Sequence, residues 1–229
     1  MPKKQLICSL STLLLCVTFV SPARADFVPI ANPDPGYILA TNLMPAVDPE
    51  FSTVTSVTDG INTATFYIAP NPVPSALTIY DVGSGWSTWS SPPFAETSTP
   101  RVLGTTSQLE IRLDSSSLVF GFEAEPQPFG IHTITADFYG GGVLRGSISR
   151  DVEGDSGARL FAGFSSLGID DIFINSTDDF GIAQLRYGVV QPTPEPKAVL
   201  LLAGVGILLC WYGSRRLRRR ESTKLGECA

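Results

Sequence analysis

Apolar and polar residues alternate in short stretches throughout the middle of the chain. In residues 133–139, for example, Ile134, Ala136 and Phe138 occupy every second position, and polar residues occupy most of the positions between them. A period of two is typical of a β-strand that has one buried face and one face in contact with water. No long stretch has the period of an amphipathic helix, so the middle of the chain is predicted to be built from strands.

Ten such stretches are separated by clusters of Gly, Pro, Asn, Asp and Ser, which are typical of turns. The expected strands are residues 53–57, 63–68, 76–80, 108–113, 117–124, 132–139, 143–149, 158–164, 169–175 and 182–189. Three consecutive glycines at 140–142 predict a hairpin, because glycine accepts positive φ freely. This pattern predicts an all-β fold, a single β-sandwich of jelly-roll or galactose-binding-like type spanning residues 26–190.

The first 25 residues have the pattern of a secretory signal peptide. Two lysines precede an apolar stretch at residues 6–20, and Ala23 and Ala25 form a small-x-small cleavage site. The apolar stretch is too short to span a membrane comfortably, which favours a cleaved signal over a permanent anchor.

The C-terminal end has three successive parts. A proline-rich linker at residues 191–197 leads into an apolar stretch at 198–213, which is followed by a basic tail at 214–229. The apolar stretch would form a helix about 24 Å long, short for a transmembrane helix but able to span if the flanking basic side chains reach the interface. Five arginines in the tail predict a cytoplasmic location for it, which leaves the sandwich outside: Arg215, Arg216, Arg218, Arg219 and Arg220.

Pro194, Glu195 and Pro196, the short apolar helix and the arginine cluster together resemble the PEP-CTERM sorting signal of exosortase-processed proteins. The resemblance implies recognition by an exosortase in the inner membrane of a Gram-negative bacterium and cleavage near this motif. It further implies release or transfer to the cell surface, often alongside exopolysaccharide production. The alternative is a single-pass membrane protein that is never cut.

A second and softer resemblance covers residues 118–190, which contain Phe-Gly-Phe-Glu at 120–123 and Gly-Ile-Asp-Asp-Ile at 168–172. These segments are similar to a module found among such processed proteins. The resemblance implies a galactose-binding-like or carbohydrate-module-like sandwich and implies no catalysis.

The charge of the expected exported part is strongly negative. Residues 26–193 contain six Arg, no Lys and 19 acidic residues, and they contain no cysteine. A domain of this charge is repelled by nucleic acid, so nucleic acid is excluded as a partner. Its stability must come from the core rather than from disulfides.

Two groups of residues are candidate binding sites. Trp86 and Trp89 lie in a loop-like segment, where exposed indole rings could stack on sugars, although packing into the core or covering a sheet edge is the commoner use of such side chains. Asp151, Glu153 and Asp155 alternate like the start of a calcium loop but lack its glycine and closing glutamate positions. Calcium is therefore the one cofactor the sequence leaves open, and Asp170–Asp171 are expected to be solvated turn residues.

No arrangement of residues predicts catalysis. Glu123 and Glu125 share one strand face and are expected to be ordinary solvent-facing acids, and His132, the single histidine, begins a strand without a nucleophile motif. We therefore expect a non-enzymatic envelope or extracellular-matrix protein. The alternatives are a carbohydrate-binding module that retains exopolysaccharide, and an uncleaved single-pass membrane protein. The expected partners are the exosortase, the inner membrane during sorting and exopolysaccharide.

Overall fold

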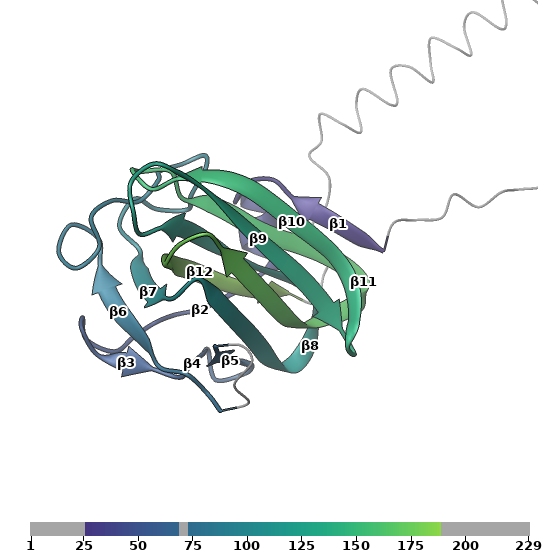
Figure 1. Ribbon diagram of the computed structural model, residues 1–229. Coiled ribbons are helices and arrows are strands. Elements are labelled where there is room, and N and C mark those ends of the chain that lie inside the picture. The colour runs from purple at the N-terminus through teal and green to yellow at the C-terminus, as the bar shows by residue number, and fades with distance from the viewer. Residues whose placement is uncertain (1–25, 69–72, 189–229) are drawn as a thin grey trace, which may run out of the picture.

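The computed structural model describes residues 26–68 and 73–188, and within them the fold is almost entirely β (Figure 1). One short helix, α1 (Pro35–Ala40), accompanies the strands. The strands are β1 (Phe27–Ile30), β2 (Asn42–Met44), β3 (Thr53–Val54), β4 (Ser56–Thr58), β5 (Thr63–Tyr67), β6 (Leu77–Asp81), β7 (Arg101–Thr105), β8 (Gln108–Pro126), β9 (Ile131–Gly140), β10 (Val143–Glu153), β11 (Arg159–Ser176) and β12 (Phe180–Gly188).

Two long strands, β8 and β11, run through both halves of the fold. The first part of β8 pairs with β5 and its second part pairs with β12, while β11 follows β8 along its length. All twelve strands belong to one hydrogen-bonded sheet that folds into two layers sharing β8 and β11. The first layer, called here the first sheet, is β4-β5-β8-β11-β9-β10, and the second layer, the second sheet, is β1-β11-β8-β12, extended by β2, β7, β6 and β3. In Figure 1, β8, β9, β10 and β11 form a broad twisted layer.

The change from one sheet to the other occurs where the ladder between β8 and β11 is irregular. Its register shifts between Phe164 and Ile169, a segment that includes Gly168 with φ 83°. Irregular pairing bends a strand and increases its twist, and glycine accepts positive φ at little cost. This bend turns the inner faces of the two halves towards each other, so that both enclose one core.

The core contains large side chains from both sheets. Phe66, Ile111 and Phe138 come from the first sheet, and Phe122 and Phe180 come from the second, all of them completely buried. The rings of Phe122 and Phe161 stack with centroids 5.7 Å apart. This arrangement confirms the predicted β-sandwich.

The alternating pattern located most of the strands. In β9, Ile134, Ala136 and Phe138 are buried while Thr133 is exposed and Asp137 is only half-buried, as the sequence predicted. The structure differs in joining the expected strands 108–113 and 117–124 into β8, and 158–164 and 169–175 into β11. Pattern analysis also missed β1, β2, β7 and α1, which are short and lack the alternation of apolar and polar residues that the equally short β5 and β6 show.

Two segments of the chain cover the outer face of the second sheet. Helix α1 lies over β8 and β11, where Tyr37 packs with Val119, Leu160 and Ala162 in a small buried cluster. Residues 82–100 cover the neighbouring area, where Trp86 and Trp89 are buried. The outer face of the first sheet has no such cover among the described residues.

The ends of the described chain lie on one side of the second sheet. Val28, Phe164, Val119 and Gly188 are successive partners across β1, β11, β8 and β12. Three strand spacings, or about 14 Å, therefore separate Val28 from Gly188.

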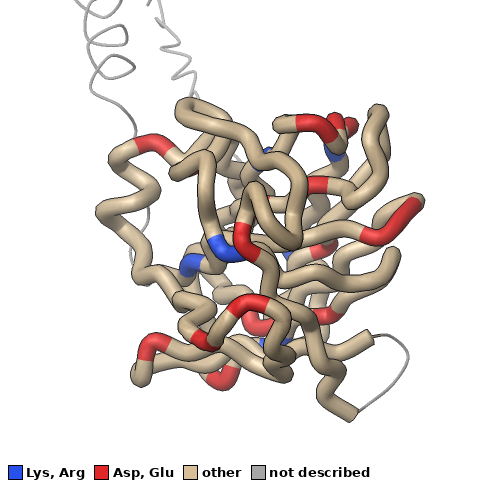
Figure 2. Tube along the Cα trace, turned by 90° about the vertical axis from the view of Figure 1, so that its left-hand side faces the viewer, with Lys and Arg blue, Asp and Glu red and all other residues tan. Residues whose placement is uncertain are grey.

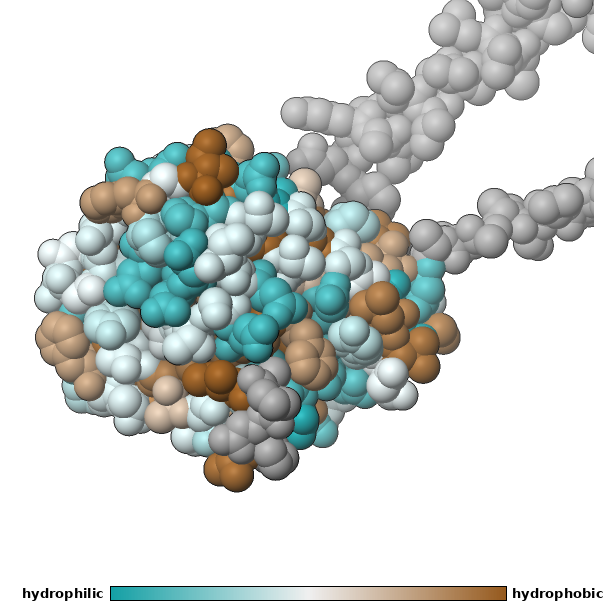
Figure 3. Space-filling view, in the orientation of Figure 1, coloured by the Kyte–Doolittle hydropathy of each residue, from teal (hydrophilic) through white to brown (hydrophobic). Residues whose placement is uncertain are grey.

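Figure 3 shows exposed apolar residues scattered over this view of the surface rather than gathered into one broad patch.

Among residues 26–68 and 73–188, no helix is long and apolar enough to cross a membrane. The expected signal peptide, proline-rich linker, transmembrane helix and basic tail lie outside the described residues.

Gly121 offers a test of how α1 is seated on the second sheet. A Cβ at this position would lie 2.3 Å from the Cβ of Ala162 and 2.6 Å from the hydroxyl oxygen of Tyr37, both closer than packing permits. We expect Gly121→Ala to lower the free energy of unfolding by about 1–3 kcal/mol in chemical denaturation. Ser115→Ala, at an exposed position of the same strand, is the control and should change it by less than about 0.5 kcal/mol. Equal stability of the two variants would contradict this packing.

Candidate functional site

The uncovered outer face of the first sheet brings aromatic and charged side chains together in rows. Partner residues on neighbouring strands point to the same side of a sheet. One row across β5, β8, β11, β9 and β10 consists of Tyr67, Glu110, Phe173, Asp137 and Ser147. The next row consists of Thr65, Arg112, Asp171, Tyr139 and Leu144. We call these ten residues the open face, and it spans about 19 Å across five strands.

Glu110, Arg112 and Asp171 form the charged centre of the open face. The Nε of Arg112 lies 2.5 Å from Oε1 of Glu110, and the guanidinium also lies over the Tyr67 ring, 4.3 Å from its centroid. The Glu110 side chain is only 5% exposed, whereas that of Arg112 is 47% exposed. The arginine therefore covers the buried glutamate and neutralises it.

Asp171 meets Glu110 without a donor between the two carboxyl groups. Burial raises the pKa of Asp171 to about 7, and the nearby charge of Glu110 raises it further against the opposing effect of Arg112. Its Oδ1 atom is buried and has no hydrogen-bond partner in the described part of the protein. The pair therefore favours a proton shared between the two carboxyl groups.

Aromatic rings lie on both sides of this centre. Tyr139 and Phe173 contact each other edge to face, with centroids 5.6 Å apart, and Tyr67 lies on the opposite side of Glu110. All three rings are half-buried, so each presents part of its surface to solvent. Asp137, in the same row as Phe173, accepts a hydrogen bond from Ser147.

This combination suits the binding of a hydroxyl-rich molecule. Aromatic rings pack against the apolar faces of sugar rings, and carboxylate oxygens accept hydrogen bonds from hydroxyl groups. The sheet holds these side chains on a rigid backbone, which limits the entropy lost when a ligand binds.

Trp86 and Trp89 pack inside the protein, which is the alternative to the hypothesis that they contact sugars. The two side chains are 6% and 4% exposed, and their indole N–H groups point into the protein. Nε1 of Trp89 donates to Oε2 of Glu123 at 2.9 Å, and Nε1 of Trp86 donates to Oε2 of Glu125 at 3.1 Å. The backbone N–H of Glu96 donates to Oε1 of Glu123 at 2.6 Å. The ring faces that would stack on sugars are thus inside the domain.

The expected solvent-facing position of Glu123 and Glu125 is wrong, since both are completely buried. The two residues do share one face of β8, but residues 82–100 cover that face. Glu125 accepts further hydrogen bonds from Gly157 N at 3.0 Å and Thr88 Oγ1 at 3.3 Å. Desolvation by burial raises the pKa of Glu123 to about 7 and that of Glu125 to about 6, against the lowering effect of these donors.

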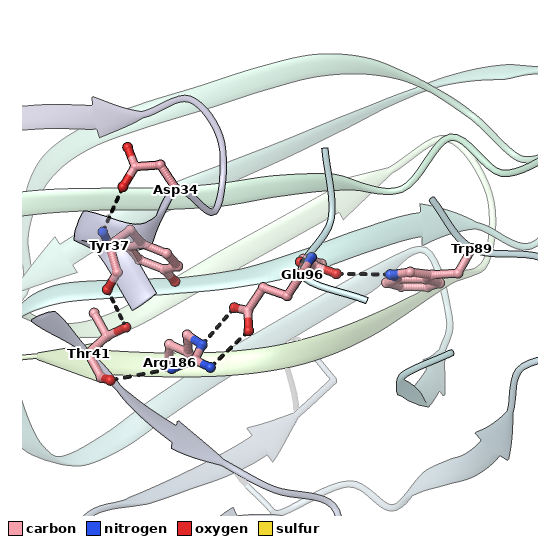
Figure 4. A network of polar contacts seen from close by, with 7 residues as sticks. Asp34, Tyr37, Thr41, Trp89, Glu96 and Arg186 are labelled. Carbon is pink, nitrogen blue, oxygen red and sulfur yellow. Dashed lines mark hydrogen bonds and ion pairs between the residues drawn. The ribbon is translucent and has the colours of Figure 1, made fainter. Parts of the chain in front are cut away.

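A second polar network connects residues 82–100 to α1 and β12 (Figure 4). Two nitrogens of the Arg186 guanidinium donate to Glu96, Nε to Oε1 at 2.6 Å and Nη2 to Oε2 at 2.8 Å. Arg186 also donates to the Thr41 carbonyl, and Thr41 Oγ1 donates to the Tyr37 carbonyl. At the start of the helix, Asp34 accepts from Tyr37 N at 2.8 Å, the usual role of an N-cap.

The candidate calcium residues do not converge. Asp151 accepts from Thr133 Oγ1 at 2.7 Å on the outer face, and Glu153 accepts from Gly130 N at 2.8 Å. Asp155 lies in the turn after β10. Within the described ranges, no group of three or more His, Cys, Asp or Glu residues could hold a metal ion.

His132 lies at the start of β9 as predicted, and both of its ring nitrogens face acceptors. Nδ1 lies 2.7 Å from Oδ2 of Asp178, and Nε2 lies 3.2 Å from the Phe129 carbonyl. A hydrolytic triad needs the second nitrogen to face a nucleophilic hydroxyl, and a carbonyl oxygen occupies that position here.

The sorting and processing residues lie outside the described residues, so their assignments remain predictions. These are Ala23, Ala25, Pro194, Glu195, Pro196 and the five arginines of the tail.

Sequence reasoning missed the open face. It assigned Asp171 to a solvated turn, whereas the residue lies within β11, opposite Arg112 and Tyr139. The alternation of Ile172 and Ile174 with polar or aromatic residues was a usable signal for that face. The pairing of strands distant in sequence, which brings Glu110 beside Asp171, leaves no local signal.

No protein-family model and no curated protein matches the chain. Among solved structures, the carbohydrate binding module of lichenase 5A from Cellvibrio mixtus, in complex with cellotriose, is 12% identical. The match covers 66% of this chain and 98% of the module, with a TM-score of 0.26. A putative sugar binding protein from Bacteroides thetaiotaomicron is 9% identical over 65% of this chain and 87% of its own, with a TM-score of 0.22.

A family two carbohydrate esterase from Cellvibrio japonicus is 11% identical, with a TM-score of 0.23. The match covers 74% of this chain and 36% of the esterase, so the chain spans about a third of that protein.

The buried carboxyl of Glu123 predicts a characteristic dependence of stability on pH. Its ordinary pKa of 4.5 applies in the unfolded chain, and its folded pKa is about 7. Between these values the folded state holds the proton more tightly, so the free energy of unfolding should fall as pH rises from 4.5 to 7, by about 3 kcal/mol for this group. Glu125 and Asp171 act in the same direction.

Denaturant unfolding at several pH values measures this effect. In Glu123→Gln the slope of unfolding free energy against pH should be shallower across this window, whereas Ser115→Ala, which removes no titratable group, should keep the wild-type slope. An unchanged slope in Glu123→Gln would contradict the buried position of this carboxyl.

Proposed function

We propose that this chain is an exported envelope or matrix protein whose β-sandwich binds polysaccharide without catalysis, through the open face. The observation that supports this most is the arrangement of Tyr67, Phe173 and Tyr139 around the half-buried acceptors Asp137 and Asp171 on an uncovered sheet. Such a surface offers apolar ring faces and hydrogen-bond acceptors in one rigid plane, which matches the two sides of a sugar ring.

The carboxyl pairs argue for binding rather than hydrolysis. Glycoside hydrolases hold two carboxyl groups about 5–9 Å apart so that a glycosidic bond lies between them. Glu110 and Asp171 instead contact each other, and Arg112 covers Glu110. Glu123 and Glu125 are buried beneath the indole rings, where no substrate reaches them.

The route to the envelope is proposed from the ends of the sequence. The signal peptide and the tail that resembles a PEP-CTERM signal direct the sandwich outwards, with an exosortase cutting near Pro194–Pro196. The position of Val28 and Gly188 on one side of the second sheet suits this route, because the sandwich can be held from one side while its open face stays free. The finer fold assignment, a jelly roll of galactose-binding-like type, is part of this proposal.

Ring substitutions test the binding function. Tyr139→Ala and Phe173→Ala should each weaken binding to a retained polysaccharide about two- to tenfold, because each removes one stacking surface. Affinity electrophoresis of the purified exported protein in gels that contain the polysaccharide measures this. Phe129→Ala is the matched control, since this aromatic ring is 67% exposed in a loop away from the open face. Unchanged binding in both ring variants would contradict the proposal.

Intact-mass analysis tests the sorting. The exported wild-type protein should lack both residues 1–25 and the arginine-rich tail. A variant with Pro194, Glu195 and Pro196 all replaced by alanine should keep Arg215–Arg220 and remain in the inner membrane. Recovery of wild-type protein with the complete tail would show an uncleaved single-pass protein instead.

A further inference from the structure

We infer that the open face selects polysaccharides that carry no acidic sugars. This inference rests on the proposed function and adds the chemical class of the ligand. It follows from the charges on the open face and from the partners of every arginine in the described residues.

The open face presents acceptors and almost no free positive charge. Its two rows contain three carboxyl groups, those of Glu110, Asp137 and Asp171, and one arginine. That arginine, Arg112, is bonded to Glu110 at 2.5 Å and lies over the Tyr67 ring. The charge of Glu110 offsets that of Arg112, and the carboxyl groups of Asp137 and Asp171 have no further cation on the open face to offset them.

The other five arginines of the described chain are also engaged. Arg101, Arg145 and Arg186 each pair with a carboxylate, that of Asp81, Asp26 and Glu96 respectively. Arg150 and Arg159 donate to backbone carbonyls. Figure 2 shows the few basic positions scattered among more numerous acidic ones. No other arginine lies on the open face to take over the role of Arg112.

A uronate-containing or sulfated polymer would therefore place its negative charges against carboxylates. In addition, residues 26–193 contain 19 acidic residues and six arginines, and this net negative charge would repel such a polymer at long range. A neutral sugar has the opposite properties, because its hydroxyl groups can donate to the half-buried carboxyl groups of Asp137 and Asp171 without adding negative charge. The charge pattern thus excludes one class of glycan and suits another.

A cationic polymer would be distinguished by how it binds. Attraction to the acidic domain as a whole is screened by salt and does not depend on particular rings. Binding of a neutral glycan at the open face depends on Tyr139 and Phe173 and is almost independent of ionic strength. Salt dependence and ring dependence together separate the two.

Affinity electrophoresis of the exported protein against a defined set of polymers tests the inference. The probes are neutral polymers (a mixed-linkage β-glucan, a galactomannan and a dextran), acidic ones (alginate and polygalacturonate) and one cationic polymer (chitosan). At least one neutral polymer should retard the protein, with a dissociation constant that changes less than twofold between 50 and 500 mM NaCl. The acidic polymers should bind at least tenfold more weakly.

A charge-reversal variant tests the origin of the selectivity. Asp137→Lys supplies a cation in the row that contains Phe173, so it should strengthen alginate binding at least threefold. Asp137→Asn removes the charge without adding a cation and is the matched control, expected to gain less. Circular dichroism and thermal unfolding show whether both variants keep the wild-type fold. The polymer test is repeated with Arg112→Lys, which keeps the positive charge at position 112 and leaves Asp137 unaltered.

The contradicting results are distinct. If an acidic polymer binds as tightly as any neutral one, and Tyr139→Ala and Phe173→Ala weaken it, the ligand class is wrong and the open face remains the binding site. If no polymer binds, or if only chitosan binds and salt abolishes it without any effect of the rings, both the ligand class and the proposed function fail.

Discussion

The arrangement of this protein depends on how two buried carboxylates obtain their hydrogen-bond donors. Glu123 and Glu125 project from the outer face of β8, and burying them without donors would cost several kcal/mol each. The indole N–H groups of Trp89 and Trp86 supply those donors, which fixes residues 82–100 over the second sheet. One side of the sandwich is thereby closed, and the outer face of the first sheet is the one that remains available to a ligand.

The sequence was sufficient for the fold class because strand alternation is a local property. The pattern around Phe138 correctly predicted which side of β9 is buried. It could not predict that two expected strands continue through Ser115 as the single strand β8. An interruption of the alternating pattern looks the same in the sequence whether the strand bends there or ends there. The short strands β2 and β7 were missed because they do not alternate; in β7, for example, the buried residues Val102 and Leu103 are adjacent, whereas the equally short β5 and β6 alternate and were predicted.

The site was less predictable because it depends on contacts between distant segments. Trp86 and Trp89 lie among Gly, Ser and Pro residues, which favours an exposed loop, and only the position of Glu123, 34 residues beyond Trp89, shows why the loop turns inwards. In retrospect, acidic residues within the apolar segment around Phe122 were a signal of buried acceptors in need of donors. The open face places Tyr67 and Tyr139 on the same surface of four paired strands, and no local sequence pattern indicates that these strands pair.

The central claim is that the tryptophans are enclosed while the rings of the open face meet solvent. Hydroxyl-radical footprinting of the exported protein, read out by mass spectrometry of its peptides, measures both in one experiment. The account predicts that Tyr139 and Phe173 are oxidised in the native state, and that Trp86 and Trp89, although intrinsically more reactive, are protected until the protein unfolds. Rapid oxidation of either tryptophan in the native protein, with Tyr139 and Phe173 protected, would contradict it.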